Sequence, residues 1–159
     1  MFRLAALLLL TLAAPGGAVA ALRETPYGQA AGWTVLARFD SAGFTGCRAI
    51  SHGPGGDIAL SRTPTGWYLH IPAPIPGPAS IGGLLRLDAG PAVPQRYDIG
   101  LGPLAGTALA EGTVARLATA DRMRTRLFGH PPTDWPVTGT GAALALLAAC
   151  LDGGGLPPG

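Results

Sequence analysis

The stretch "TGTGAALALLAACLDGGG", residues 138–155, predicts an apolar helix, and the fold must provide a surface that buries this helix. Its middle consists of Ala and Leu around a single Cys. Thr138 or Thr140 is a suitable N-cap, and Gly153 is a suitable stop. The pattern predicts a helix that is apolar nearly all round, and such a helix must be buried against a sheet or a partner. Its last turn carries Cys150, one of the two cysteines in the chain.

Residues 1–20, "MFRLAALLLLTLAAPGGAVA", have the features of a secretory signal peptide. Arg3 precedes an apolar run from Leu4 to Leu12, and the segment closes on the small residues Ala18 to Ala20. The apolar run is shorter than the roughly 20 residues that cross a bilayer, so a membrane anchor is the weaker alternative. We therefore expect a periplasmic or secreted protein with no transmembrane span after removal of the signal.

The length and the net charge of the remaining chain limit how many domains it forms and what kind of partner it binds. The sequence has 159 residues, with 11 basic residues, all Arg, against 9 acidic ones. Without Arg3 the net charge is about +1, far too even for a nucleic-acid-binding surface, and no nucleic acid is expected as a partner. We expect residues 21–152 to form a single β-rich domain, followed by a flexible tail at residues 153–159.

The two cysteines are most simply explained as a disulfide, because the expected compartment is oxidising. A bond between Cys47 and Cys150 would close a loop of about 100 residues, for which the chain-entropy model gives roughly 4.7 kcal/mol. The alternatives are unpaired or intermolecular thiols, or a metal site. Cys47 and His52 are close in sequence, but no second pair completes a zinc-type set. No metal or cofactor is expected.

Short strands between turn signals account for most of the domain. Residues 32–39, "GWTVLARF", alternate with the period of two that is typical of a strand. Residues 72–80 are too rich in Pro for a central strand and are expected to be a connector. Further strands are predicted at residues 47–50, 57–62, 66–71, 83–88, 96–100 and 122–129, with a short helix within 107–121 capped by Thr107 or Thr113. The fold class is therefore mainly β, an antiparallel sandwich or open barrel with a short helix and a buried C-terminal helix.

This order of elements resembles the invasion-associated locus B family. The resemblance rests on residues 33–35 ("WTV"), the helix at 113–120, the strand at 122–128 and the segment "WPVTGTGAALALL". It implies a small exported protein of alphaproteobacterial envelopes with a β-sandwich-like fold and no known catalytic residues. The family has a cysteine where Ala37 stands and a second pair mid-chain that this sequence lacks, and Cys150 is outside its pattern. The resemblance therefore assigns no functional site.

Catalytic motifs are weak in this sequence. Ser51, His52 and Asp57 occur together in "SHGPGGD", but a triad is assembled by the fold, and the sequence has no G-x-S-x-G nucleophile elbow. A polar hairpin loop is the simpler interpretation. His70 is expected to face solvent, because it alternates with Trp67, Leu69 and Ile71. We expect a protein that is not an enzyme.

The one group of residues that indicates binding is an arginine row. Arg122, Arg124 and Arg126 should share one strand face, about 6.5–7 Å apart, opposite Met123, Thr125 and Leu127. The row could bind an anionic partner, an envelope protein or an anionic glycolipid, or it could be a solvated outer face. We expect an exported, non-catalytic envelope protein that binds or supports a partner. The alternative is a small secreted hydrolase or enzyme inhibitor acting through the Gly-rich loop around His52.

Overall fold

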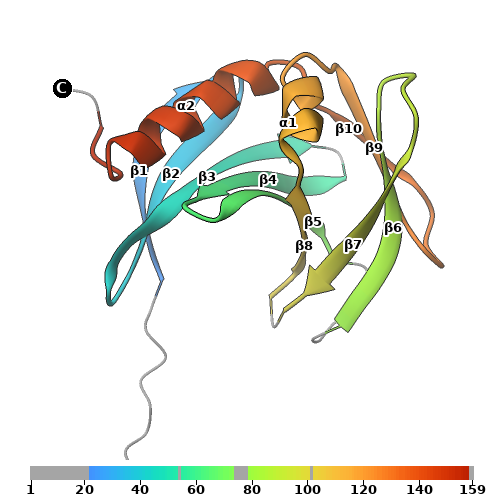
Figure 1. The fold of residues 1–159 in the computed structure, drawn as a ribbon, viewed down its shortest axis with the longest axis horizontal. Helices are drawn as coiled ribbons and strands as arrows, with labels where there is room; N and C mark the ends of the chain where they lie inside the picture. The colour runs from blue at the N-terminus through green and yellow to red at the C-terminus, as the bar shows by residue number, and fades with distance from the viewer. Residues whose placement is uncertain (1–21, 54, 74–78, 101, 158–159) are drawn as a thin grey trace, which may run out of the picture.

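The computed structural model describes residues 22–53, 55–73, 79–100 and 102–157 (Figure 1). The expected signal peptide lies outside these residues and stays a prediction. The described chain forms ten strands and two helices. Their bounds are β1 Arg23–Ala30, β2 Trp33–Asp40, β3 Gly43–Gly53, β4 Gly56–Thr63, β5 Gly66–Pro72, β6 Ala79–Leu87, β7 Val93–Ile99, β8 Leu104–Leu109, α1 Glu111–Leu117, β9 Arg122–Leu127, β10 Thr133–Pro136 and α2 Thr140–Asp152.

The described strands make one antiparallel sheet in the order β1-β2-β3-β4-β5-β8-β7-β6-β9-β10. Strands β7 and β8 share only the pairs Asp98–Gly106 and Ile99–Ala105, so the sheet has two halves that meet at this seam. Figure 1 shows the sheet curling around the core, with β1 and β10 as its two edges. The prediction of a mainly β, open antiparallel fold is confirmed.

Helix α2 packs on β1 to β4 and covers one face of this half of the sheet (Figure 1). The side of the helix toward the sheet is buried and includes Ala143, Leu144 and Leu147. Ala142 and Ala145 on the other side are exposed. The predicted C-terminal helix is therefore confirmed, with the sheet as its packing partner.

A disulfide joins Cys47 in β3 to Cys150 in the last turn of α2, as predicted. The two Cα atoms are 6.2 Å apart, and both side chains are fully buried. Gly155 follows the helix and is also buried, against Phe44 and Ala37. The bond thus fixes the C-terminal end of α2 to a strand inside the sheet.

The sequence prediction missed strands β1, β8 and β10, whereas the short helix within 107–121 is confirmed. Neither predicted cap is correct, because Thr107 lies in β8 and Thr113 lies within the helix. The helix itself covers only Glu111–Leu117, with Ala110 as its N-cap. Strands β1 and β10 are edge strands that contain Pro26 and Pro136. Edge strands tolerate Pro, so local composition does not identify them.

The N-cap of α2 also differs from the prediction. The cap is Gly139 with φ 83°, and no side chain caps the helix. A Cβ on Gly139 would overlap Ala31 in the turn between β1 and β2, so glycine is required both by the backbone and by this contact. Thr138 instead donates to Asp121, and Thr140 donates to the carbonyl of Val137. The predicted stop at Gly153 is confirmed.

Candidate anion-binding face

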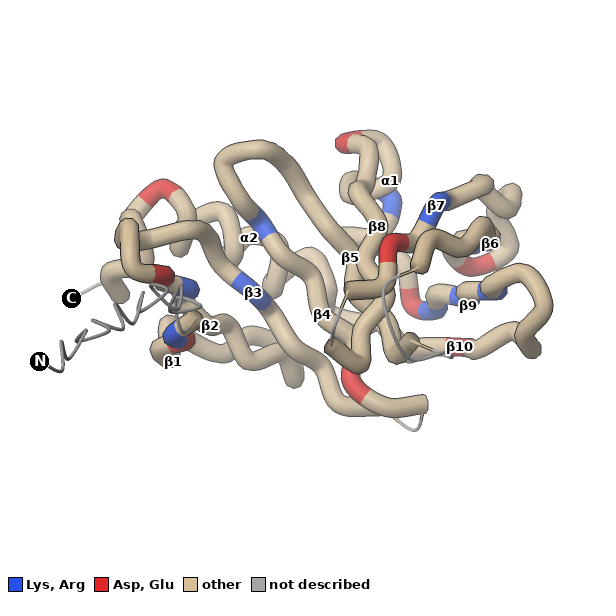
Figure 2. The backbone as a smooth tube through the Cα atoms, turned by 90° about the horizontal axis from the view of Figure 1, so that it is seen from below, with Lys and Arg blue, Asp and Glu red and all other residues tan. Residues whose placement is uncertain are grey.

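The predicted arginine row lies on the outer side of β9. Arg122, Arg124 and Arg126 are exposed, and the residues that alternate with them are buried in the core. This arrangement follows from strand geometry, because successive side chains point to opposite faces. Figure 2 shows β9 with its neighbours β6 and β10, and with β7 beyond β6, at the opposite end of the molecule from β1 and β2. The geometric part of the prediction is confirmed.

Strand β6 adds a fourth arginine that the sequence prediction missed. Arg86 is paired with Arg124 in the β6–β9 register, and its side chain is half-buried. Its alternation with Leu85 and Leu87 shows that it faces away from the core, but only the strand pairing places it beside the row. We call the outer side of β6, β9 and β10, with Arg86, Arg122, Arg124 and Arg126, the arginine face.

Strand β10 supplies an acidic partner for one of these arginines. Asp134 is paired with Arg124 in the β9–β10 register, and the guanidinium donates from Nε to Oδ1 and from Nη2 to Oδ2, both at 2.6 Å. These hydrogen bonds hold the pKa of the Asp134 carboxyl below its usual range against an opposing effect of burial, and the charges of Arg122 and Arg86 add to the lowering. The pair is thus a fixed, neutral centre within the arginine face.

Two further acids, Asp88 and Asp121, line the largest hollow beside Arg122, and each accepts a hydrogen bond that is not from a guanidinium. The Oδ1 atom of Asp88 accepts from the backbone N–H groups of Asp121 and Arg122, at 3.2 and 2.9 Å. Asp121 accepts from the Thr138 hydroxyl at 3.2 Å.

The remaining arginines have no such partner. Among the residues that the structure describes, no ion pair involves Arg86, Arg122 or Arg126. Within the same residues, the buried Nε of Arg86 has no hydrogen-bond partner. Three guanidinium groups therefore surround the Arg124–Asp134 pair without a carboxylate of their own.

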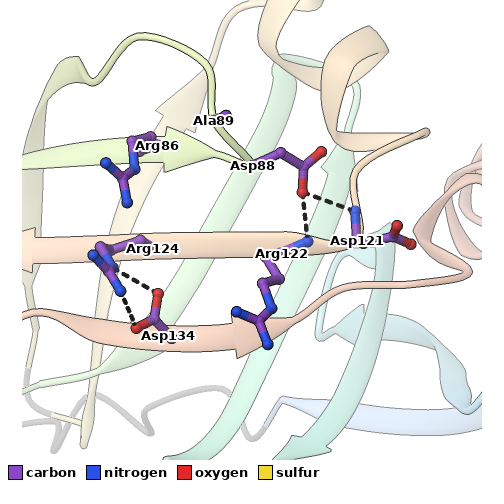
Figure 3. Close-up of a pocket in the computed structure, with 7 residues that line it drawn as sticks. All are labelled: Arg86, Asp88, Ala89, Asp121, Arg122, Arg124 and Asp134. Atoms are coloured by element: carbon purple, nitrogen blue, oxygen red, sulfur yellow. Dashed lines mark hydrogen bonds and ion pairs between the residues drawn. The ribbon is translucent and has the colours of Figure 1, made fainter.

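Three adjoining hollows lie on the arginine face, with volumes of about 620, 440 and 200 Å³. Figure 3 shows the largest, with Arg86, Arg122 and Arg124 extending from neighbouring strands on the same side of the sheet. The smallest combines arginines with apolar walls and is lined by Leu84, Arg86, Ala92, Arg124, Arg126 and Pro132. The hollows are open depressions that could accommodate an anionic group held by several guanidinium groups.

The Gly-rich loop around His52 has a simpler geometry. His52 in β3 lies opposite Asp57 in β4, and the Nδ1 and Oδ1 atoms are 2.6 Å apart. Both side chains are largely exposed. Ser51 is adjacent to His52 in the same strand, so its side chain points to the other face. The structure therefore does not bring Ser51, His52 and Asp57 together as a triad.

A polar cluster lies on the outer side of β1 to β5, where His70 was expected to face solvent. That expectation is wrong, because His70 is half-buried and its Nε2 atom is 3.1 Å from the Ser61 hydroxyl. Burial, followed by the nearby charges of Arg48 and Arg38, lowers the pKa of His70 to about 4. Both arginines are within ion-pair distance of Glu24. The imidazole is thus neutral at neutral pH.

The described residues offer neither a metal site nor a membrane-spanning helix. In the described part of the chain, no group of three or more His, Cys, Asp or Glu side chains is arranged to hold a metal ion. Neither helix that the structure describes has the length and apolar character needed to cross a membrane.

The fold places the chain in a class of mainly β proteins in which a C-terminal helix packs on an open antiparallel sheet. The crystal structure of invasion associated protein B from Bartonella henselae has a similar fold, with a TM-score of 0.57. The alignment covers 79% of this chain and 97% of that chain, at 14% sequence identity. The resemblance predicted from the sequence is therefore confirmed as a distant one, at the level of the fold. No family model and no curated protein matches the sequence.

Proposed function

We propose that this chain is an exported, non-catalytic envelope protein that binds an anionic partner through the arginine face. The observation that carries the proposal is the set of three arginines, Arg86, Arg122 and Arg126, that have no ion pair among the described residues. Export is supported by the signal-like N-terminus and by the buried disulfide, since disulfides persist in oxidising compartments. An envelope role is supported by the fold shared with an invasion associated protein.

Guanidinium chemistry explains why such a face suits an anion. Each guanidinium presents planar, paired N–H donors that match a carboxylate or a phosphate, and charge-assisted hydrogen bonds of this kind are stronger than neutral ones. The largest hollow brings the guanidinium groups of Arg86, Arg122 and Arg124 to one surface, where an anion could accept from two strands at once. Binding would weaken with added salt, because the groups are close to solvent.

The test is calorimetric titration of the protein with tripolyphosphate and with a glutamate-rich peptide. We expect the wild type to bind at least one of these probes, and Arg122→Gln and Arg126→Gln each to weaken binding about fivefold, as expected for one charge-assisted contact of about 1 kcal/mol. Arg23→Gln is the matched control, because it removes one exposed guanidinium from β1, in the other half of the sheet. If all three variants bind as the wild type does, the proposed function is wrong.

The alternative of a small secreted hydrolase or enzyme inhibitor acting through the loop around His52 keeps one supporting observation, the close His52–Asp57 pair. A carboxylate at this distance can orient an imidazole for proton transfer. The alternative would be favoured if the protein hydrolysed an ester or peptide substrate, or inhibited a hydrolase, and if His52→Ala abolished that activity. No such effect of the variant would leave the anion-binding proposal as the better explanation.

A further inference from the structure

The arginine face ends in an exposed aromatic ring. Phe128 follows β9, and its backbone N–H donates to the carbonyl of Gly82 at 2.9 Å, so the strand alternation continues and places Phe128 on the same side as Arg126. The side chain is 56% exposed, whereas most large apolar side chains that the structure describes are buried. The ring lies over Gly82, where a Cβ would be 2.9 Å from two ring carbons. Glycine at this position therefore allows the ring to lie flat beside the arginines.

Charge and apolar character change along this row. At one end Arg122 is near Asp88 and Asp121, whereas no acidic residue occurs from Arg122 to Pro132 in the sequence. Beside Arg126 the smallest hollow has the apolar walls Leu84, Ala92 and Pro132. The connection between β9 and β10 thus presents Phe128 and Pro132 at its tip, and the unpaired Arg126 and the apolar Leu84 of β6 lie beside them.

We propose that the tip of the β9–β10 hairpin docks on an anionic lipid surface. Phe128 enters the boundary between headgroups and acyl chains, while Arg126 and Arg86 bind lipid phosphates. An arginine can keep its stem on apolar surface and its guanidinium in the polar layer, and an adjacent aromatic ring gains from leaving water. An acidic peptide would satisfy the arginines but would leave Phe128 without an apolar partner. The inference rests on the proposed function and adds the class of partner to it.

The experiment is co-sedimentation of the mature protein with phosphatidylcholine vesicles that contain or lack phosphatidylglycerol. We expect binding only to the anionic vesicles, and weaker binding as salt is added. Arg126→Gln should weaken this binding about fivefold, because one basic side chain near an anionic surface contributes about that much. Phe128→Ser should also lower vesicle binding severalfold but should leave tripolyphosphate binding unchanged.

Matched controls separate these effects from general losses. Leu156→Ser removes another exposed apolar side chain, 73% exposed, and Arg23→Gln removes another exposed arginine, so neither should alter vesicle binding. Phe128→Trp keeps an interfacial ring and should retain binding, and thermal melting of each variant verifies its folding. Equal vesicle binding by Phe128→Ser and wild type, or binding of the glutamate-rich peptide without vesicle binding, would overturn the lipid inference alone. Wild-type affinity of the Arg122 and Arg126 variants for every probe would overturn the proposed function as well.

Discussion

His70 illustrates how a single side chain couples stability to pH. Its imidazole lies on the outer side of β5, beside the Ser61 hydroxyl and near the guanidinium groups of Arg48 and Arg38. Burial and the two positive charges both disfavour the protonated form, which lowers the pKa of His70 from 6.5 to about 4 in the folded state. The folded protein therefore binds fewer protons at this site than the unfolded chain does between these two pH values.

Acid lowers the free energy of unfolding through His70. Well above pH 6.5 the site is neutral in both states, so its contribution does not depend on pH. As the pH falls through 6.5 the unfolded state gains a proton that the folded state rejects, and stability falls until the pH reaches about 4. We expect wild type to lose about 2 kcal/mol more unfolding free energy than His70→Gln between neutral pH and pH 5. Urea denaturation of both proteins at the two pH values measures this difference. Parallel pH profiles would show that His70 is not the group responsible.

At the level of elements, α2 depends on a covalent bond as well as on packing. The helix faces β1 to β4 largely with Ala and Leu side chains, and each Ala removes less apolar surface from water than a Leu would. Close approach compensates in part, since a Cβ on Gly28 of β1 would lie 3.2 Å from Leu146. The Cys47–Cys150 bond then restricts the unfolded chain and holds the end of the helix on β3.

We predict that Cys150→Ser lowers the thermal midpoint by roughly 10 °C, from a loss of about 3 kcal/mol and roughly 3 °C per kcal/mol for a domain of this size. Differential scanning calorimetry of wild type, the variant and wild type with reductant provides the measurement. The reduced wild type and the variant should melt at similar temperatures, because both lack the cross-link. A wild-type midpoint that does not respond to reductant, once thiol titration has verified reduction, would contradict the prediction.

For the whole molecule, the seam between β7 and β8 predicts that the two halves of the sheet respond differently to reduction. Helix α2 and its disulfide belong to the half formed by β1 to β5, whereas the half with β6 and β9 shares only the two strand pairs of the seam with it. We expect reduction to accelerate amide hydrogen exchange most in α2 and β3 and least in β6 and β9. Exchange followed by mass spectrometry resolves these segments. Uniform acceleration would show that the halves open as one unit.

The arginine face also depends on this larger arrangement. The order of Arg122, Arg124 and Arg126 along β9 is a property of one strand, and its period of two was sufficient to predict a shared face. Arg86 and Asp134 join the face only because β6 and β10 flank β9 in the sheet. Arg86 is more than thirty positions from the arginine row in the sequence, and no local pattern indicates that it pairs with Arg124.

Local patterns in the sequence account for the features that depend on neighbouring residues. The sequence indicated the alternation of β2 and β9, the all-apolar character of α2 and its stop at Gly153, since these follow from periodicity and from capping within a few positions. It also indicated the Cys47–Cys150 bond, because only two cysteines were available.

Features that depend on distant residues arise only in the folded chain. Strands β1 and β10 become edge strands only through the sheet order, and their prolines make them unlike strands in the local sequence. Gly139 caps α2 because Ala31, which is distant in sequence, lies against it. Folding also buries much of His70, and this burial lowers the pKa of the imidazole. These features arise from strand order and close packing, which bring together residues far apart in the chain, and a single sequence contains no local signal for such contacts.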